Sequence, residues 1–278
     1  ENVKTIKEYT RRIAEEMHVK GLMNMQYAIE NGKVFVLEAN PRASRTVPLV
    51  SKVCNIKMVK LATDIMTSYL TGRPSPVPEL KEKKIPHYGV KMPVFPFKMF
   101  PEVDPVLGPE MRSTGEVLGM SANVGEAIYK AQEATQTRLP AKGTVLLSVN
   151  DKDKAELIEV ANGFHECGFE LMGTGRTCDI MVAAGLPAKK VAKIDEGRPN
   201  ILDKITNREV DIIINTPLDR KGMGDDSYIR KAAVKGKIPY FTNMAAAKAT
   251  VQALRTIKKN GHLGVKSLQE FHSEIREQ

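Results

Sequence analysis

The sequence is short of cysteine, histidine and aromatic residues, and each shortage excludes a class of protein. Its 278 residues include 3 Cys and 5 His, scattered without the spacing that zinc sites have. An odd, dispersed set of cysteines favours reduced thiols over a disulfide scaffold. No apolar run approaches the ~20 residues of a membrane span, and the first residues do not resemble a signal peptide. We therefore expect a cytoplasmic protein that does not cross a membrane.

Basic residues exceed acidic ones, which gives a net charge of +9. Such an excess suits nucleic-acid binding, but it also suits binding of phosphorylated metabolites. Aromatic residues make up only 5% of the chain, Trp is absent, and basic residues alternate with acidic ones. No nucleic-acid-binding motif is recognisable, so we expect no nucleic-acid partner.

Hydrophobic periodicity divides the chain into two parts, 1–141 and 142–278. The first part combines helical patterns over 3–18, 46–70 and 124–135 with a β-hairpin around Asn31-Gly32. In the second part, strand-like runs at 144–149, 168–172, 190–194, 210–215 and 238–242 alternate with helical stretches. Alternation of this kind predicts βαβ units and a parallel sheet. The expected fold class is α/β, with an α+β lobe followed by a doubly wound, five-stranded parallel sheet.

The register of the hairpin decides which of its side chains share a face. A two-residue loop at Asn31-Gly32 would place Gln26 and Glu38 on opposite faces, whereas a three-residue loop that includes Glu30 places them together. We favour the three-residue loop, because it separates an apolar face from a polar one. The apolar face would hold Met25, Tyr27, Ile29, Phe35 and Leu37, and the polar face Asn24, Gln26, Glu38 and Asn40. Oxygen-bearing side chains in such a group suit Mg²⁺, although a solvated strand face has the same composition.

Two long motifs lie around this hairpin, Gly21-Leu22-Met23-Asn24-Met25-Gln26 and Leu37-Glu38-Ala39-Asn40-Pro41-Arg42-Ala43-Ser44-Arg45-Thr46-Val47-Pro48. They resemble the end of an ATP-grasp unit of carbamoyl phosphate synthetases. A third motif of the family lies at residues 107–116, and the resemblance continues to the end of the chain. It implies that Gln26, Glu38 and Asn40 hold the Mg²⁺ or Mn²⁺ ions that bridge the ATP phosphates. It also implies that Arg42 lies near the transferred phosphate, where its planar guanidinium suits phosphate oxygens.

The resemblance implies that the chain is the carboxy-terminal piece of the large subunit. Residues 1–141 would form the end of its second, carbamate-phosphorylating ATP-grasp unit, and residues 142–278 its regulatory domain. The whole enzyme would make carbamoyl phosphate from ATP, bicarbonate and ammonia, for pyrimidine and arginine biosynthesis. A glutamine amidotransferase small subunit would supply the ammonia. Because an ATP-grasp site closes nucleotide between lobes, and a preceding lobe is missing here, we expect these residues alone to be inactive.

Polar side chains follow the predicted parallel strands where each strand ends: Ser148 and Asn150, Thr174, Lys193, Asn215 and Thr216, and Tyr240 and Thr242. Ligands of open parallel sheets bind at this edge, and a Gly-rich turn before a helix favours an anion. The turn here is Gly173-Thr174-Gly175, although Thr174 and Thr177 could equally serve only as helix caps.

This second part resembles the methylglyoxal-synthase-like regulatory domain of the same family. The resemblance implies a site for UMP or IMP at Ser148, Lys154, Thr174, Thr177, Lys193 and Asn215. It implies that Tyr240 and Thr242 contact ornithine. Pro217 replaces an expected threonine, however, and Met92 replaces an expected glutamate whose charge would pair with the ornithine ammonium. Nucleotide binding is therefore favoured over ornithine activation.

The sequence does not choose between the nucleotides or fix the sign of their effect, and it leaves open a homo-oligomer. An alternative is a stand-alone methylglyoxal-synthase-like phosphate-binding module. Methylglyoxal synthesis itself is not expected, because that chemistry needs a general base and a positioned His, and residues 217–222 contain no His.

Overall fold

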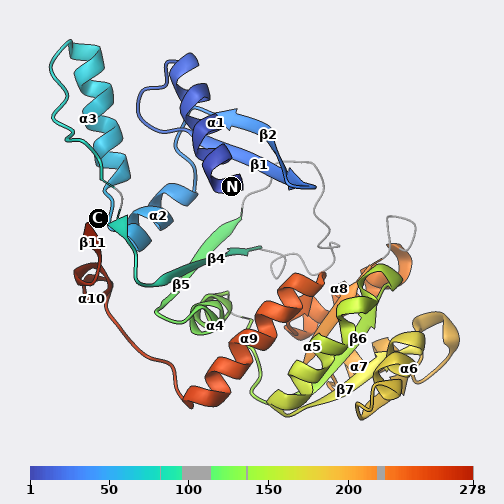
Figure 1. Ribbon diagram of the computed structural model, residues 1–278. Coiled ribbons are helices and arrows are strands. Elements are labelled where there is room, and N and C mark those ends of the chain that lie inside the picture. Colours follow the sequence, from blue (N-terminus) through green and yellow to red (C-terminus); the bar gives the residue numbers. More distant parts are fainter. Residues whose placement is uncertain (82, 96–113, 136, 218–222, 278) are drawn as a thin grey trace. The chain divides into compact units, whose positions relative to one another are not determined.

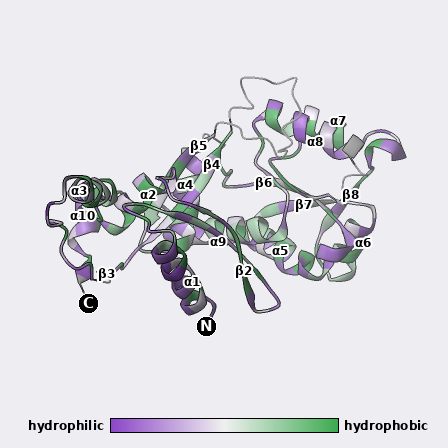
Figure 2. Ribbon diagram, turned by 90° about the horizontal axis from the view of Figure 1, so that it is seen from above, coloured by the Kyte–Doolittle hydropathy of each residue, from purple (hydrophilic) through white to green (hydrophobic). Residues whose placement is uncertain are grey.

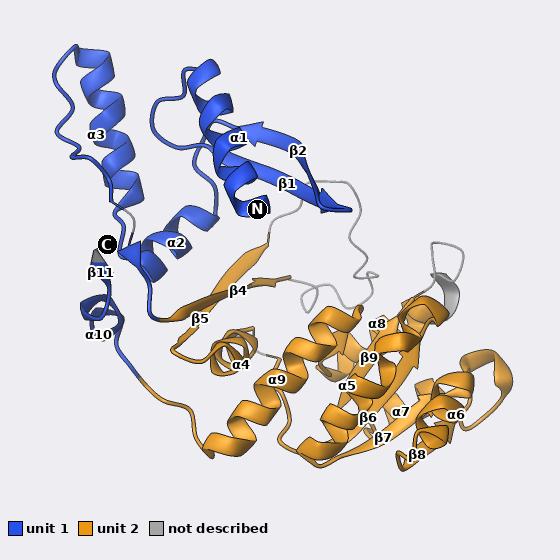
Figure 3. Cartoon of the chain, in the orientation of Figure 1, with its two compact units in different colours: residues 1–86, 266–278 blue, residues 87–265 orange. Residues whose placement is uncertain are grey.

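The computed structural model describes residues 1–81, 83–95, 114–135, 137–217 and 223–277. They form two compact units, residues 1–86 with 266–278 and residues 87–265 (Figure 3). The family motif at 107–116 lies outside the described residues. The boundary predicted between residues 141 and 142 falls inside the second unit, and as a boundary between family domains it stays a prediction.

The first unit is built on a hairpin covered by a helix. Helix α1 (Asn2–Glu16) precedes strands β1 (Asn24–Glu30) and β2 (Lys33–Asn40), which pair antiparallel. Thr10 Oγ1 of α1 lies 2.6 Å from Tyr27 Oη of β1, which ties the helix to one face of the hairpin. Figure 2 shows α1 as mainly hydrophilic, as expected for a helix that rests one face on a small sheet.

The hairpin has a two-residue loop, so the predicted three-residue loop is wrong. Glu30 pairs with Lys33 across Asn31 and Gly32, both with positive φ. The register then shifts beside Tyr27, which pairs with Val36, while Gln26 pairs with Glu38. The extra residue on β2 is Leu37. This β-bulge places Gln26 and Glu38 on the same face, which is what the three-residue loop was predicted to do.

The bulge preserves the predicted polar pairs and changes the apolar face. Directly paired residues share a face, so Gln26 lies beside Glu38. Phe35, in contrast, pairs with Ala28 and lies on the face of Gln26, and Leu37 is exposed. Their predicted place on the apolar face is therefore wrong, because the prediction assumed an uninterrupted ladder.

The helical pattern over 46–70 forms two helices instead of one. Helix α2 (Thr46–Cys54) ends at Asn55, whose φ of 50° is left-handed, and α3 (Met58–Thr71) begins three residues later. Asn tolerates this conformation better than most residues, so it ends α2. The unit is completed by β3 (Lys83–Lys84), which pairs with β11 (Arg276–Glu277), and by α10 (Leu268–Ser273).

The second unit contains the predicted doubly wound sheet. Its strands are β6 (Gly143–Val149), β7 (Phe169–Thr174), β8 (Ala188–Val191), β9 (Ile212–Thr216) and β10 (Tyr240–Phe241). They are parallel and follow the order β10-β9-β6-β7-β8. The prediction of a five-stranded parallel sheet is confirmed.

Helices cover both faces of this sheet (Figure 1). They are α5 (Lys154–Cys167), α6 (Gly175–Ala183), α7 (Ile201–Thr206), α8 (Met223–Gly236) and α9 (Met244–Asn260). Leu147 packs in one core with Phe164 of α5 and Leu254 of α9. Its neighbour Leu146 points to the other face and packs in a second core with Ile201 of α7. Two short 3₁₀ turns, η2 (Asp151–Asp153) and η3 (Ile194–Glu196), follow β6 and β8.

The same unit includes an antiparallel pair, β4 (Tyr88–Val94) and β5 (Gly115–Ser121), with α4 (Val124–Ala134). Ala127 and Ala131 of α4 are fully buried. Among the described helices, none is long and apolar enough to cross a membrane.

Candidate functional site

Polar residues gather where the central strands of the parallel sheet end. Ser148 of β6 pairs with Asn215 of β9, and Val149 pairs with Thr216. Strand β7, on the other side of β6, ends at Thr174. Because parallel strands present their carboxyl ends on one edge, these side chains lie together there, as the strand ends predicted.

A pocket of about 240 Å³ lies at this edge. All six residues predicted to contact a nucleotide line it: Ser148, Lys154, Thr174, Thr177, Lys193 and Asn215. The lining also includes Asn150, Arg176, Thr216, Pro217 and Asp226. The volume is slightly below the ~300–1,000 Å³ typical of ligand pockets, which suits a small polar molecule.

The oxygen-rich wall of the pocket is held by hydrogen bonds between strand ends and α6. Thr174 and Thr177 are each 3% exposed. Thr174 Oγ1 donates to Ser148 Oγ at 3.2 Å, and Thr177 Oγ1 donates to the Val149 carbonyl at 3.3 Å. Thr174 is the N-cap residue of α6 but its side chain makes no capping hydrogen bond. The Thr174 hydroxyl group therefore does not cap α6, and the first N–H groups of the helix can receive an anion.

Gly173 allows β7 to pass close to α6. A Cβ at this position would lie 2.6 Å from Met181 Cε and 3.0 Å from Cys178 Cα. No larger residue fits without moving the helix, so Gly173 fixes the start of α6 against the end of the strand.

Asn215 forms the opposite wall of the pocket and is 3% exposed. Its Nδ2 donates to Asp226 Oδ1 at 2.8 Å and to Tyr240 Oη at 2.9 Å. Burial raises the pKa of Tyr240, so this phenol is neutral at physiological pH. Thus Tyr240 contacts a lining residue without lining the pocket itself, while Thr242 is exposed.

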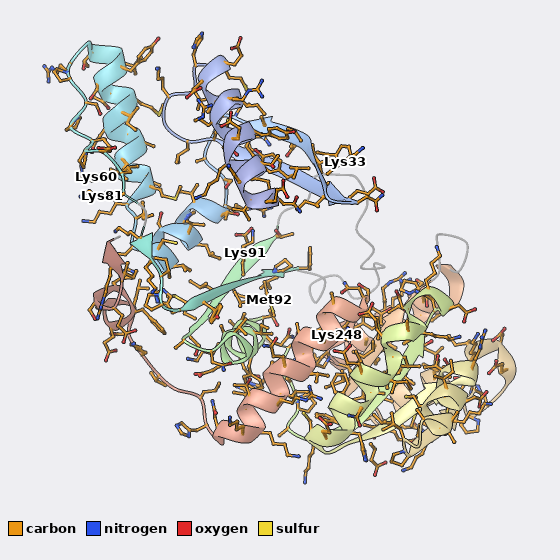
Figure 4. The ribbon with its side chains drawn as sticks, in the orientation of Figure 1. Lys33, Lys60, Lys81, Lys91, Met92 and Lys248 are labelled. Carbon is orange, nitrogen blue, oxygen red and sulfur yellow. The ribbon has the colours of Figure 1, made fainter. Side chains whose placement is uncertain are left out.

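The two departures from the family pattern fall in different places. Pro217 lines the pocket, where it offers no hydroxyl group. Met92 lies half-buried on β4 and pairs with Val117 (Figure 4).

Asp226 is a pocket residue that the sequence did not indicate. Asp226 belongs to α8, and only the packing of that helix brings it to the end of β9. Asn150 was read as one strand-end residue among several, but its Nδ2 donates to Thr216 Oγ1 at 3.1 Å. The strand-end position was the only available signal for Asn150, and Asp226 had none.

The predicted metal ligands come together on the hairpin. Gln26 Nε2 donates to Glu38 Oε1 at 2.5 Å, and Asn40 Nδ2 donates to the same oxygen at 2.8 Å. Glu38 is the one carboxylate of the set, and each amide could turn its oxygen toward a cation. Arg42 is exposed, and its Nη1 donates to the Ala43 carbonyl at 3.1 Å.

One carboxylate and two amide oxygens fit Mg²⁺ or Mn²⁺ that also binds phosphate oxygens and water. Within the described part of the chain, no group of three His, Cys, Asp or Glu residues could hold a metal. A metal at the hairpin would therefore depend on the amide oxygens.

Two families have sequence profiles that match the chain. The family described as "Carbamoyl-phosphate synthase L chain, ATP binding domain" matches residues 1–70, and the "MGS-like domain" family matches residues 156–242. A solved methylglyoxal synthase from Elizabethkingia anophelis NUHP1 is 21% identical, with a TM-score of 0.35 over 41% of this chain and 79% of that one.

Curated relatives match almost the whole chain. The carbamoyl phosphate synthase large chain of Archaeoglobus fulgidus is 48% identical over 98% of this chain and 25% of its own length. The C-terminal section of the Aquifex aeolicus large chain is 44% identical over 98% of this chain and 54% of its own length. A large chain from Methanosarcina barkeri is 44% identical over 98% of this chain and 68% of its own length. The chain thus spans a quarter to about two thirds of these relatives, and it belongs to the carbamoyl phosphate synthase large-chain family, of which it represents the C-terminal section.

Proposed function

We propose that the chain is the carboxy-terminal part of a carbamoyl phosphate synthase and regulates it by binding UMP or IMP. The observation that carries the effector role is the gathering of six predicted contact residues around one pocket. Buried hydroxyl groups, an uncapped helix start and three cationic side chains together suit a phosphate monoester. The alternative of a stand-alone methylglyoxal-synthase-like module is not favoured, since residues 1–70 match the ATP-binding domain family.

A calorimetric titration tests the effector pocket directly. We expect the chain to bind UMP or IMP in the micromolar range, and Lys193→Ala to weaken that binding at least about tenfold, as loss of a charge-assisted contact should. Lys189→Ala is a matched control, because Lys189 pairs with Glu170 outside the pocket lining. CMP and inorganic phosphate define the base and phosphate contributions. An equal loss of nucleotide affinity in Lys193→Ala and Lys189→Ala, or no binding of either nucleotide to the wild type, would contradict the proposal.

At the hairpin, Gln26, Glu38 and Asn40 would hold Mg²⁺ or Mn²⁺ against the phosphates of ATP. The metal would neutralise charge on the phosphates during transfer to carbamate. Glu38 supplies the anionic ligand, the two amides supply neutral oxygens, and Arg42 would bind the transferred phosphate. Support for this assignment comes from the shared contact of both amides with Glu38 Oε1.

The remaining assignments follow from the same family membership. The complete enzyme would act in the cytoplasm, in pyrimidine and arginine biosynthesis, with a glutamine amidotransferase small subunit as partner. The residues of this chain would be inactive on their own, since they correspond to 25% of the length of the Archaeoglobus large chain. Tyr240 and Thr242 would mark an ornithine site, which Met92 disfavours because it carries no charge. Homo-oligomerisation is compatible with this assignment.

A further inference from the structure

Three cationic side chains converge on the pocket from three elements. Lys154 begins α5, Arg176 lies in the first turn of α6, and Lys193 precedes η3. All three line the pocket. Like charges that converge disfavour one another, so this edge of the sheet favours a compensating anion.

Asp151 already supplies a negative charge beside these cations. Its Oδ1 forms an ion pair with Lys154 Nζ and lies 3.5 Å from Arg176 Nη1. The hydrogen bond from Lys154, together with the charges of Lys154, Arg176 and Lys193, lowers the pKa of Asp151, which keeps it ionised at neutral pH. The Asp151 side chain is 65% exposed, whereas that of Lys154 is only 15% exposed. Asp151 itself does not line the pocket, and its carboxylate meets two lining cations from the solvent side.

The backbone that carries Asp151 is fixed at the end of β6. Asn150 N donates to Thr216 Oγ1 at 2.9 Å, which joins this turn to β9. Asn150 Oδ1 accepts hydrogen bonds from the N–H groups of Lys152 and Asp153, which close the turn around Asp151. The fold thus fixes the backbone position of Asp151, while its carboxylate reaches the cations through the conformation of its side chain.

We infer that Asp151, which lies beside the pocket lining, competes with the phosphate of an incoming ligand for Lys154 and Arg176, and thereby lowers the affinity of the pocket for phosphate. This inference rests on the proposed function. A bare phosphate would exchange one anion for another and gain little from these cations. A nucleoside monophosphate makes the same exchange but also reaches the buried wall at Asn215 and Thr216. Asp151 therefore lowers the affinity for both ligands, and only the nucleotide offsets this cost through contacts elsewhere in the pocket.

The test is calorimetric titration of the chain with inorganic phosphate, UMP and IMP at low salt. Asp151→Asn removes the competing charge, so inorganic phosphate should bind roughly three- to tenfold more tightly. Asp151→Glu keeps the charge and should bind phosphate as the wild type does. Asp179→Asn is the matched control, because Asp179 forms a similar exposed pair at 3.0 Å with Lys190, a cation that does not line the pocket, and it should change nothing. Thermal unfolding of each variant checks that the fold is retained.

The outcomes separate this inference from the proposed function. Unchanged or weaker phosphate binding by Asp151→Asn would overturn the inference, even where UMP or IMP binds as expected. Tighter phosphate binding by Asp151→Asn, with no binding of UMP or IMP to the wild type, would support the competing carboxylate and overturn the nucleotide assignment. Absence of phosphate binding in all variants would also overturn the inference.

Discussion

At the scale of single residues, the pocket depends on polar side chains that are buried together with their partners. Asn215 and Thr216 are almost fully buried, and such groups are tolerated only when they are hydrogen-bonded. The strand-end argument located Ser148, Thr174 and Asn215, because parallel strands end on one edge. It could not locate Asp226, because the contact of Asp226 with Asn215 depends on how α8 packs. Nor could it predict the ion pairs of Asp151 with Lys154 and Arg176, because they depend on side-chain conformation.

Tyr240 should make stability depend on alkaline pH. Its pKa is raised by burial, so in the unfolded chain the phenol ionises near pH ~10 while in the folded protein it remains neutral to higher pH. The stabilisation linked to this shift is present below pH ~10 and is lost as the pH rises through the folded-state pKa.

Comparison of wild type with Tyr240→Phe isolates this effect. Near neutral pH the variant should be less stable by about 1 kcal/mol, because Asn215 Nδ2 loses an acceptor. In urea unfolding from about pH 8 to about pH 11, the advantage of the wild type should shrink above pH ~10. A constant difference in the free energy of unfolding between the two proteins across this pH range would show that burial does not raise the pKa of Tyr240.

At the scale of elements, the sequence predicted the parallel strands to within a few residues. Strand β6 was expected at 144–149 and spans Gly143–Val149, while β8 was expected at 190–194 and spans Ala188–Val191. Periodicity does not reveal single-residue interruptions, however. The bulge at Leu37 and the break at Asn55 each depend on one residue's conformation, so the register of the hairpin and the division of α2 from α3 were missed.

The proposed metal site depends on the hairpin register, which makes it testable at this scale. In the complete large chain with ATP, Glu38→Gln should lower Mn²⁺ affinity by at least about tenfold, because it removes the one carboxylate of the set. Glu30→Gln, a change on the same hairpin beside the loop, should leave that affinity unchanged. Electron paramagnetic resonance of Mn²⁺ measures both, and equal affinities would remove Glu38 from the metal ligands.

At the scale of the whole molecule, the two parts of the sequence were predictable to different degrees. The second part alternates strands and helices, a pattern with few packing solutions, and its doubly wound sheet followed from the sequence. The first part has no such repeating pattern. Its assignment came from the long motif around Glu38 and Arg42, and no physical argument from periodicity would have replaced that motif.

The most direct test of the proposed function is the response of the complete enzyme to its effector. The large chain, assembled with its small subunit, is assayed for carbamoyl phosphate synthesis with and without UMP or IMP, as wild type and as Lys193→Ala. We predict that a nucleotide changes the rate of the wild type, and that Lys193→Ala keeps the basal rate but loses at least most of the response, because binding and regulation are linked. An unchanged nucleotide response in Lys193→Ala, or no response in the wild type, would contradict the assignment of this pocket as the effector site.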